Sequence, residues 1–236
     1  MFSWFWKGKA DLSPGGSKVL RYGAPPKQTG STGSTVSEFR EQREAVYDSM
    51  FGEASEVYHE VFPAIPHIDV YVYPAREGRK CWTLVTGGMS DVPMNLPVKV
   101  RALKQGPAKR VELIFYCTEP RKDYQETLRQ LAHFPHTYQT WIGPGHTMPN
   151  GNPPAAIWEF APKLDTLLFM PSIVSEHRLL PDRLTLGGDP VEFLWMVPLT
   201  GAECEFKLEK GYNALLGLFE EHRHPHVFDP ERGSYV

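Results

Sequence analysis

The sequence predicts one α+β domain in which a mixed, largely antiparallel sheet packs against helices. Helical and strand patterns do not alternate along the 236 residues as they would in a series of βαβ units. The 20 glycines and 22 prolines favour short strands joined by turns. We expect the ordered domain to span residues 35–222, between a flexible tail and linker at residues 1–34 and an irregular C-terminal tail at residues 223–236.

Apolar residues at helical spacing predict helices at residues 35–51, 53–61, 120–133 and 202–222. Thr35 and Glu38 have the spacing of a capping box, and Pro135 is expected to end the third helix. Runs of β-branched and aromatic residues predict strands at residues 68–73, 81–86, 110–117, 140–143, 166–170 and 191–199. The first two strands form a hairpin, whereas residues 144–154 are rich in proline and glycine and are predicted to form a loop.

Composition and charge exclude several classes of protein. A net charge of −3 lacks the basic excess that binding of nucleic acid requires. The three cysteines are far apart, which speaks against a disulfide framework and a thiolate zinc site and fits a reducing cytoplasm. The histidines of His222-Arg-His224-Pro-His226 have no carboxylate or cysteine at ligand spacing. We therefore expect no metal and no cofactor.

The N-terminus raises the question of a membrane. No run of about 20 apolar residues is present, so an integral membrane segment is not expected. The first nine residues, MFSWFWKGK, combine aromatic rings with lysines, a composition that suits a membrane surface. The stretch is too short for a stable amphipathic helix. We favour a loose end, with association at a membrane surface as an alternative.

A double glycine ends the strand at residues 81–86 and opens a polar loop. Gly87 and Gly88 indicate positive φ angles or a close approach of another backbone. Ser90 lies in Gly-Met-Ser-Asp-Val, which lacks the final glycine of a nucleophile elbow, so a serine hydrolase is not favoured. Glu112, within an apolar strand, is costly to bury unless paired. It either faces solvent or meets Arg110, Arg101 or a donor from the loop.

A second candidate loop follows Trp141. His146, between Gly145 and Thr147, can either orient this loop by hydrogen bonding or act as a general base. No nucleophile can be identified beside it, so we favour orientation and keep a hydrolase that uses the His146 loop as an alternative.

Six motifs follow one another along the chain: GGMSD at residues 87–91, RVELIFY at 110–116, YQETLRQLAHFP at 124–135, GHTMPNG at 145–151 after Trp141, TLLFMPS at 166–172 and GDPVEFLWMVPL at 188–199. In this order they resemble the Suppressor of fused domain family. The resemblance covers roughly residues 62–219. It implies an α+β sandwich and a non-catalytic protein-binding module.

The resemblance also carries expectations about partners. Animal members hold an extended peptide of Gli transcription factors between two domains by strand addition. This chain has room for the first domain alone, so we expect no Gli recognition. The short form is similar to bacterial members, many of which are thought to be immunity proteins. We therefore expect a cytoplasmic immunity or adaptor protein that neutralises a polypeptide partner such as a toxin; its oligomeric state is not predicted.

Two sets of site residues follow. The residues expected to contact a partner are Gly88, Met89, Ser90, Asp91, Met94, Trp141, His146 and Asn150. Those expected to hold the framework are Gly87, Gly145, Glu112 and Phe115. No catalytic residue is assigned. If the first loop meets the partner, Asp91→Arg should weaken complex formation while the thermal melt stays nearly unchanged.

Overall fold

The computed structural model describes residues 11–24, 38–61, 66–101, 103, 106–174, 177 and 180–236, without the side chains of residues 180 and 181. The aromatic N-terminus and the capping box at Thr35 lie outside the described residues. Among the described residues, no helix is long and apolar enough to cross a membrane.

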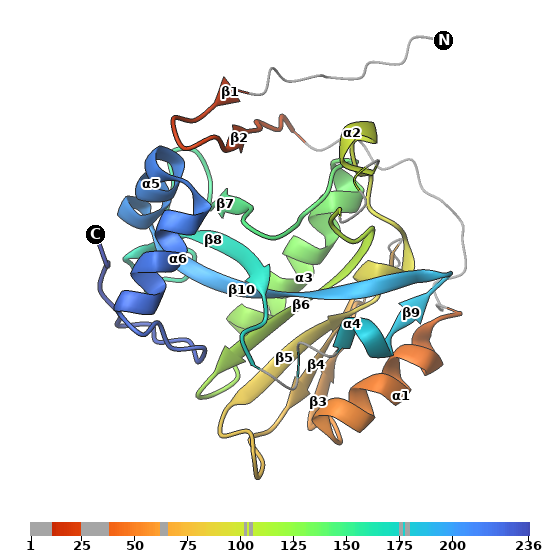
Figure 1. Cartoon of the computed structure of the whole chain (residues 1–236). Coiled ribbons are helices and arrows are strands. Elements are labelled where there is room, and N and C mark those ends of the chain that lie inside the picture. The colour runs from red at the N-terminus through yellow and green to blue at the C-terminus, as the bar shows by residue number, and fades with distance from the viewer. Residues whose placement is uncertain are drawn as a thin grey trace.

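One mixed sheet runs through the molecule (Figure 1). Its strands are β3 (Glu56–Tyr58), β4 (Asp69–Tyr73), β5 (Trp82–Gly87), β6 (Arg110–Cys117), β7 (Thr147–Pro149), β8 (Leu164–Pro171), β9 (Thr185–Leu186) and β10 (Asp189–Thr200). The order is β3-β4-β5-β6-β10-β8-β7, and β9 pairs with the start of β10. Strands β6 and β10 are parallel and the other pairs are antiparallel. The predicted fold class is confirmed.

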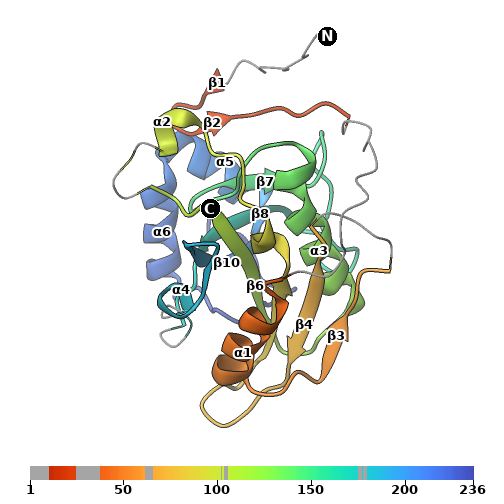
Figure 2. The ribbon, with the colours of Figure 1, turned by 90° about the vertical axis from the view of Figure 1, so that its right-hand side faces the viewer.

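Helices cover both faces of this sheet (Figure 2). They are α1 (Arg40–Phe51), α2 (Val98–Arg101), α3 (Lys122–Thr137), α4 (Leu180–Arg183), α5 (Gly201–Lys210) and α6 (Tyr212–Glu221), with a 3-10 turn, η1, at Met89–Asp91. One core packs under α3 and the other under α1 and α6. Strand β6 serves both, because Phe115 faces the α3 side and Tyr116 faces the α1 side.

Four local predictions are wrong. Residues 53–61 form no helix, because Glu56–Tyr58 pairs with β4 as an edge strand. Pro135 lies inside α3, which continues to Thr137. Residues 140–143 form no strand, whereas β7 forms within the predicted loop. The C-terminal helix is broken into α5 and α6 at Gly211, whose φ is 94°. Long-range pairing overrides local propensity at β3 and β7.

Residues 11–24 form a short hairpin and its continuation, which we call the strap. Its strands are β1 (Asp11–Leu12) and β2 (Lys18–Val19). Gly15 N donates to Leu208 O of α5 over 2.7 Å, and a Cβ on Gly15 would lie 2.5 Å from Gly211 N. At the other end, the Tyr22 ring meets Phe134 of α3, and the Tyr22 and Thr140 hydroxyls are 2.7 Å apart. The strap therefore joins α5 to the C-terminal end of α3 (Figure 1).

The C-terminal residues 222–236 contain no regular element but are fixed to the fold by a buried ion pair. Arg232 binds both carboxylate oxygens of Glu203 over 2.7 Å each, and it also donates to Pro198 O. Glu203 stands at N3 of α5 and completes a capping box with Thr200. The guanidinium lowers the pKa of Glu203.

Glu203→Ala should lower the free energy of unfolding by about 3–5 kcal/mol, because it leaves the Arg232 guanidinium buried without its partner. Glu205→Ala, an exposed neighbour on α5, is the matched control. Urea unfolding of both variants measures the difference. Equal losses would show that the Arg232 pair does not hold the C-terminal segment.

Candidate functional site

The first predicted loop is held by the buried carboxylate of Glu112, which is 0% exposed. Oε2 accepts from Thr86 Oγ1 over 2.6 Å. Oε1 accepts from Gly88 N and Ser90 N, each over 3.0 Å, and from Ser90 Oγ over 2.5 Å. Of the alternatives for Glu112, a donor from the loop is therefore the one observed. The carboxylate ties β6 to the end of β5 and to η1.

Charged side chains lie around the Glu112 carboxylate and its hydrogen-bond donors. Burial raises the pKa of Glu112, while the charge of Arg43 and the hydroxyl and amide donors oppose the rise. Arg43 itself is buried and forms an ion pair with Asp91. Arg110 donates to Ser90 O over 2.7 Å and to Asp91 O over 2.8 Å. Two guanidinium groups thus fix the backbone and the side chain that follow Gly88.

The double glycine is required by close approach. A Cβ on Gly87 would lie 2.6 Å from the Tyr71 ring and 2.9 Å from Arg43 Nε. A Cβ on Gly88, whose φ is +115°, would lie 1.9 Å from His67 O. Both glycines therefore serve the framework, the role expected for Gly87.

This geometry corrects the contact role expected for much of the loop. Met89 and Ser90 are 0% exposed and Met94 is 5% exposed, so these side chains do not reach a partner in this conformation. Asp91 is committed to Arg43, and Asp91→Arg would set two guanidinium groups side by side. Asp91→Arg should therefore lower the melting temperature and not leave it unchanged. Ser90 Oγ is occupied by Glu112 and is not placed as a nucleophile.

The second loop is more accessible. The rings of Trp141 and His146 are 4.2 Å apart, and both are partly exposed. Burial and the charge of Lys207 lower the pKa of His146 to about 4, so the ring is neutral at pH 7. No hydroxyl or thiol of a described residue hydrogen-bonds to this imidazole. Asn150 is exposed and closes the loop by donating to Ala155 O and Ala156 O.

The structure brings the two loops together through residues 138–143. Asn95 N donates to Thr140 O over 3.1 Å, and Asn95 Nδ2 donates to Gln139 O over 3.0 Å. Ile142 N also donates to Met94 Sδ. The loop with Trp141 and His146 therefore rests on the loop that Glu112 holds. Gly145 permits this path with a φ of +81° against the Tyr212 ring.

The accessible loop contains an edge strand that the sequence does not indicate. Phe169 N donates to His146 O and Asn150 N donates to Asp165 O. Alternation in an antiparallel ladder then points the N–H and C=O of Thr147 away from β8. No described residue bonds to these two groups, and β7 ends the sheet on this side. Thr147 therefore presents an open backbone edge.

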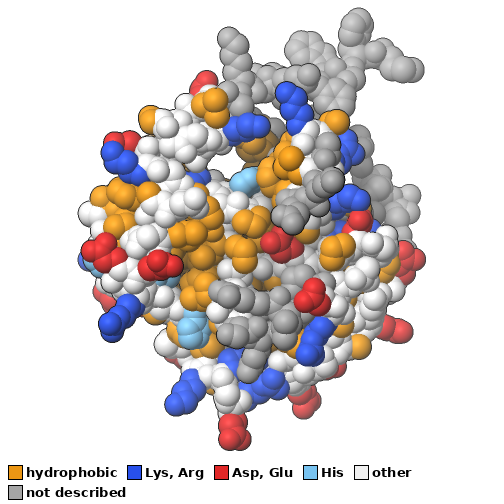
Figure 3. Space-filling view, viewed as in Figure 1, with side chains coloured by type: hydrophobic (Ala, Val, Ile, Leu, Met, Phe, Trp, Pro, Cys, Tyr) orange, Lys and Arg blue, Asp and Glu red, His pale blue; other side chains and the backbone are white. Residues whose placement is uncertain are grey.

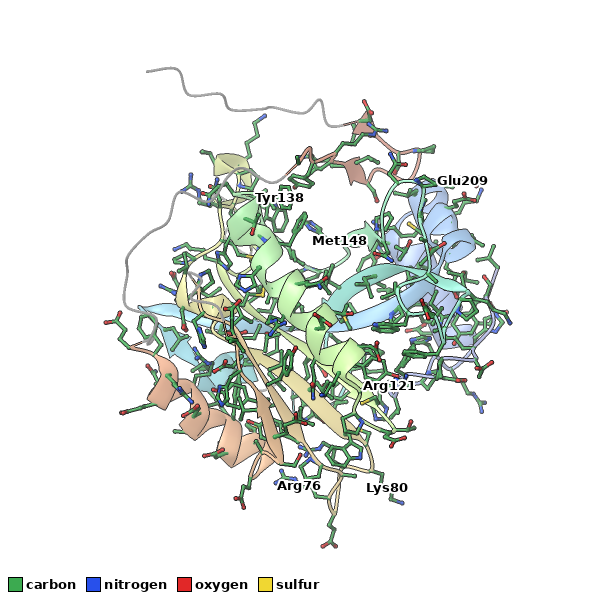
Figure 4. All side chains as sticks on the ribbon, turned by 180° about the vertical axis from the view of Figure 1, so that it is seen from behind. Arg76, Lys80, Arg121, Tyr138, Met148 and Glu209 are labelled. Carbon is green, nitrogen blue, oxygen red and sulfur yellow. The ribbon has the colours of Figure 1, made fainter. Side chains whose placement is uncertain are left out.

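A hollow lies beside this edge. The strap passes over β7, and Figure 3 shows that side chains do not fill the space between them. Figure 4 shows the same region from behind, with Tyr138 at the end of α3 on one side and Met148 of β7 below. In Figure 3 apolar side chains and a histidine lie at the rim of the hollow, and basic side chains lie around it.

The histidines of the C-terminal segment are spread over different partners. His222 stacks on Tyr235, His224 stacks on Phe219, and His226 lies 4.0 Å from Cys81 Sγ. Within the part of the chain that the structure describes, no group of three or more histidine, cysteine or acidic side chains is placed to hold a metal ion.

The sequence of this chain matches the model of one known protein family. The model of the Suppressor of fused protein (SUFU) family matches residues 65–233, more than two thirds of the chain. The chain belongs to the Suppressor of fused family. No curated protein matches the chain at a significant level. The domain boundaries at residues 34 and 222 stay predictions.

Solved structures share the fold of this Suppressor of fused domain. A SUFU homologue from Neisseria gonorrhoeae is 16% identical, with a TM-score of 0.63 over 84% of this chain and 97% of that one. A chain of the Sufu–Fu complex is 13% identical, with a TM-score of 0.56 over 83% and 89%. Drosophila Suppressor of Fused is 13% identical, with a TM-score of 0.50 over 83% of this chain and 50% of that one.

Glu112→Gln should lower the free energy of unfolding by about 1–3 kcal/mol, because the new amide turns a donor toward other donors in a buried site. Amide hydrogen exchange at Gly88 and Ser90 should accelerate with it. Glu126→Gln, exposed on α3, is the control for the change of charge. Unchanged exchange at both amides would contradict the anchoring role of Glu112.

Proposed function

We propose that this Suppressor of fused domain is a non-catalytic module that binds an extended segment of a protein partner along β7. The observation that carries the proposal is the open edge at Thr147 of β7, the strand over which the strap passes with a hollow between them (Figure 3). An unpaired strand edge is a template for another strand, whose backbone bonds supply affinity while side-chain contacts supply specificity.

The edge itself limits what backbone bonds can contribute. Thr147 offers one N–H and one C=O, and Pro149 has no N–H to offer. A bound segment therefore depends on side-chain contacts for much of its affinity. Trp141, His146 and Met148 stand at the loop with part of their surface exposed, and aromatic side chains with partly apolar surroundings suit such contacts. Trp141, His146 and Asn150 remain proposed contact residues.

A binding role agrees with the comparisons more closely than a catalytic one. One similar solved structure is a complex of Sufu with Fu. Ser90 is occupied by Glu112, and His146 has no nucleophile among the described residues, so the hydrolase alternative gains no support from the geometry. Within this binding role we propose an immunity or adaptor protein, on the strength of the resemblance to bacterial members, with a toxin as the type of partner.

Thr147→Pro should abolish capture of the partner, because it removes the N–H that an added strand would use and disturbs the strand geometry. Thr147→Ser keeps that N–H and the side-chain hydroxyl, so it is the matched control. Both variants and the wild type serve as bait for native cell extract, with thermal melts to verify folding. A partner retained equally by all three folded proteins would exclude β7 as the binding edge.

The immunity assignment has a separate experiment. The captured partner, expressed alone, should arrest growth, and co-expression of this chain should restore it because binding masks the toxic surface. Thr147→Pro should fail to restore growth, whereas Thr147→Ser should succeed. If the captured partner is harmless when expressed alone, the proposal that the partner is a toxin is contradicted, and the adaptor role is the one that remains.

A further inference from the structure

Lys207 is a buried cation without a counter-ion. It projects from α5 and is 4% exposed. Its ammonium lies 3.5 Å from Thr147 Oγ1, and no carboxylate among the described residues forms an ion pair with it. Taking an ammonium out of water without a partner costs several kcal/mol. Burial accordingly lowers the pKa of Lys207.

The Cys204 thiol, which acts electrostatically on Lys207, does not supply the missing charge. Cys204, one turn earlier on α5, is buried beside Thr147 and Thr166, and burial raises the pKa of its thiol. A neutral thiol leaves the ammonium uncompensated. The other lysine of α5, Lys210, is exposed and pairs with Glu209 over 2.7 Å. The lack of compensation is therefore particular to Lys207 within this helix.

The register of β7 relates Lys207 to the open edge. Thr147 lies opposite Leu168, whose side chain packs in the core on the α1 and α6 side. Met148 lies opposite Leu167, whose side chain packs on the α3 side. A strand added along β7 would place the residue opposite Thr147 on the Lys207 side, with Cβ atoms about 4.5–5.5 Å apart. The residues before and after it would face the side of Met148.

We propose that Lys207 selects an acidic residue in the segment that binds along β7, with an apolar residue on each side of it. The inference rests on the proposed function and names the chemistry of the partner at that site. The carboxylate would complete an ion pair with the Lys207 ammonium and accept from the Thr147 hydroxyl. The two flanking side chains would meet Met148 and the Trp141 side of the sheet, where both of these apolar side chains are partly buried against the core under α3.

Charge distribution favours this occupant. The chain carries a net charge of −3, so a positive site within it is a local feature. Around the hollow, Figure 3 shows basic side chains, and the neutral imidazole of His146 adds no second positive charge that would demand a phosphate. One ammonium and one hydroxyl match a single carboxylate in an otherwise apolar strand.

The test uses a phage-displayed library of random dodecapeptides panned against the full chain. Selected peptides should share an Asp or Glu between two apolar residues. Each is then synthesised with that acid and with its amide, Asn or Gln. Dissociation constants are measured for wild type, Lys207→Met and Lys210→Met, the last being the control on the same helix.

The expected result is a double-mutant coupling. With wild type and with Lys210→Met, the acidic peptide should bind at least about tenfold more tightly than its amide, which corresponds to about 1.4 kcal/mol. With Lys207→Met this preference should disappear. Loss of affinity for acid and amide alike would indicate a purely structural Lys207 and overturn the proposal. Lys207→Met should also raise the melting temperature of the free protein, since it removes an uncompensated buried charge.

The remaining outcomes distinguish the role proposed for Lys207 from the proposed strand addition along β7. Peptides that lose binding on Thr147→Pro but show no preference for an acid would overturn the role of Lys207 and leave strand addition intact. Peptides that bind Thr147→Pro as well as wild type would overturn both, as would a library that yields no binder. A melting temperature lowered by Lys207→Met would show that the ammonium is already compensated, and would also overturn the inference.

Discussion

The arrangement of the two loops beside β7 depends on one buried carboxylate. Glu112 stands in the middle of β6 and collects two hydroxyl and two amide donors from the end of β5 and from η1. A carboxylate in this position is stable only while those donors keep their places, so the side chain fixes the path of the chain after Gly88. That path brings Met94 and Asn95 against residues 139–142, on which the second loop rests.

A series of contacts connects the Glu112 site to β7. The end of α3 is held from one side by Met89, whose carbonyl meets His136, and from the other by Tyr22 of the strap. The chain then turns through Trp141 and His146 into the edge strand. Each step is fixed by packing or by a backbone bond, so an edge of three residues keeps a defined position at the rim of an eight-stranded sheet. Rigid support of this kind preorganises a binding edge.

The central strands and the double glycine of the first loop can be predicted from the sequence, because the patterns that indicate them lie within short runs of residues. Runs such as residues 110–117 and 191–199 are apolar and β-branched, and the double glycine has a steric cause that any close approach would impose. Strands β3 and β7 escape prediction because each has three residues, which is too few to show the alternation or the β-branched run of a strand. For β7 the neighbouring prolines and glycines also conceal the strand behind a loop-like composition.

Lys207 escapes prediction for a different reason. Read as one helix, residues 202–222 place Leu208 and Tyr212 on the buried face. The break at Gly211 separates the two halves, and the buried positions of α5 become Glu203, Cys204 and Lys207. The spacing of Thr200 and Glu203 is a capping-box signal that could have located the start of α5 and therefore its face.

Three buried charges then distinguish framework from function. Glu112 is surrounded by donors, and Glu203 is paired with Arg232; both are compensated within the chain and hold segments in place. Lys207 has a similar degree of burial but a single hydroxyl at 3.5 Å. A fold that compensates two buried carboxylates has the means to compensate a lysine, and uncompensated buried charge persists where a ligand supplies the partner. Because that lysine lies beside the open edge of β7, the ligand that we propose is a strand with a carboxylate.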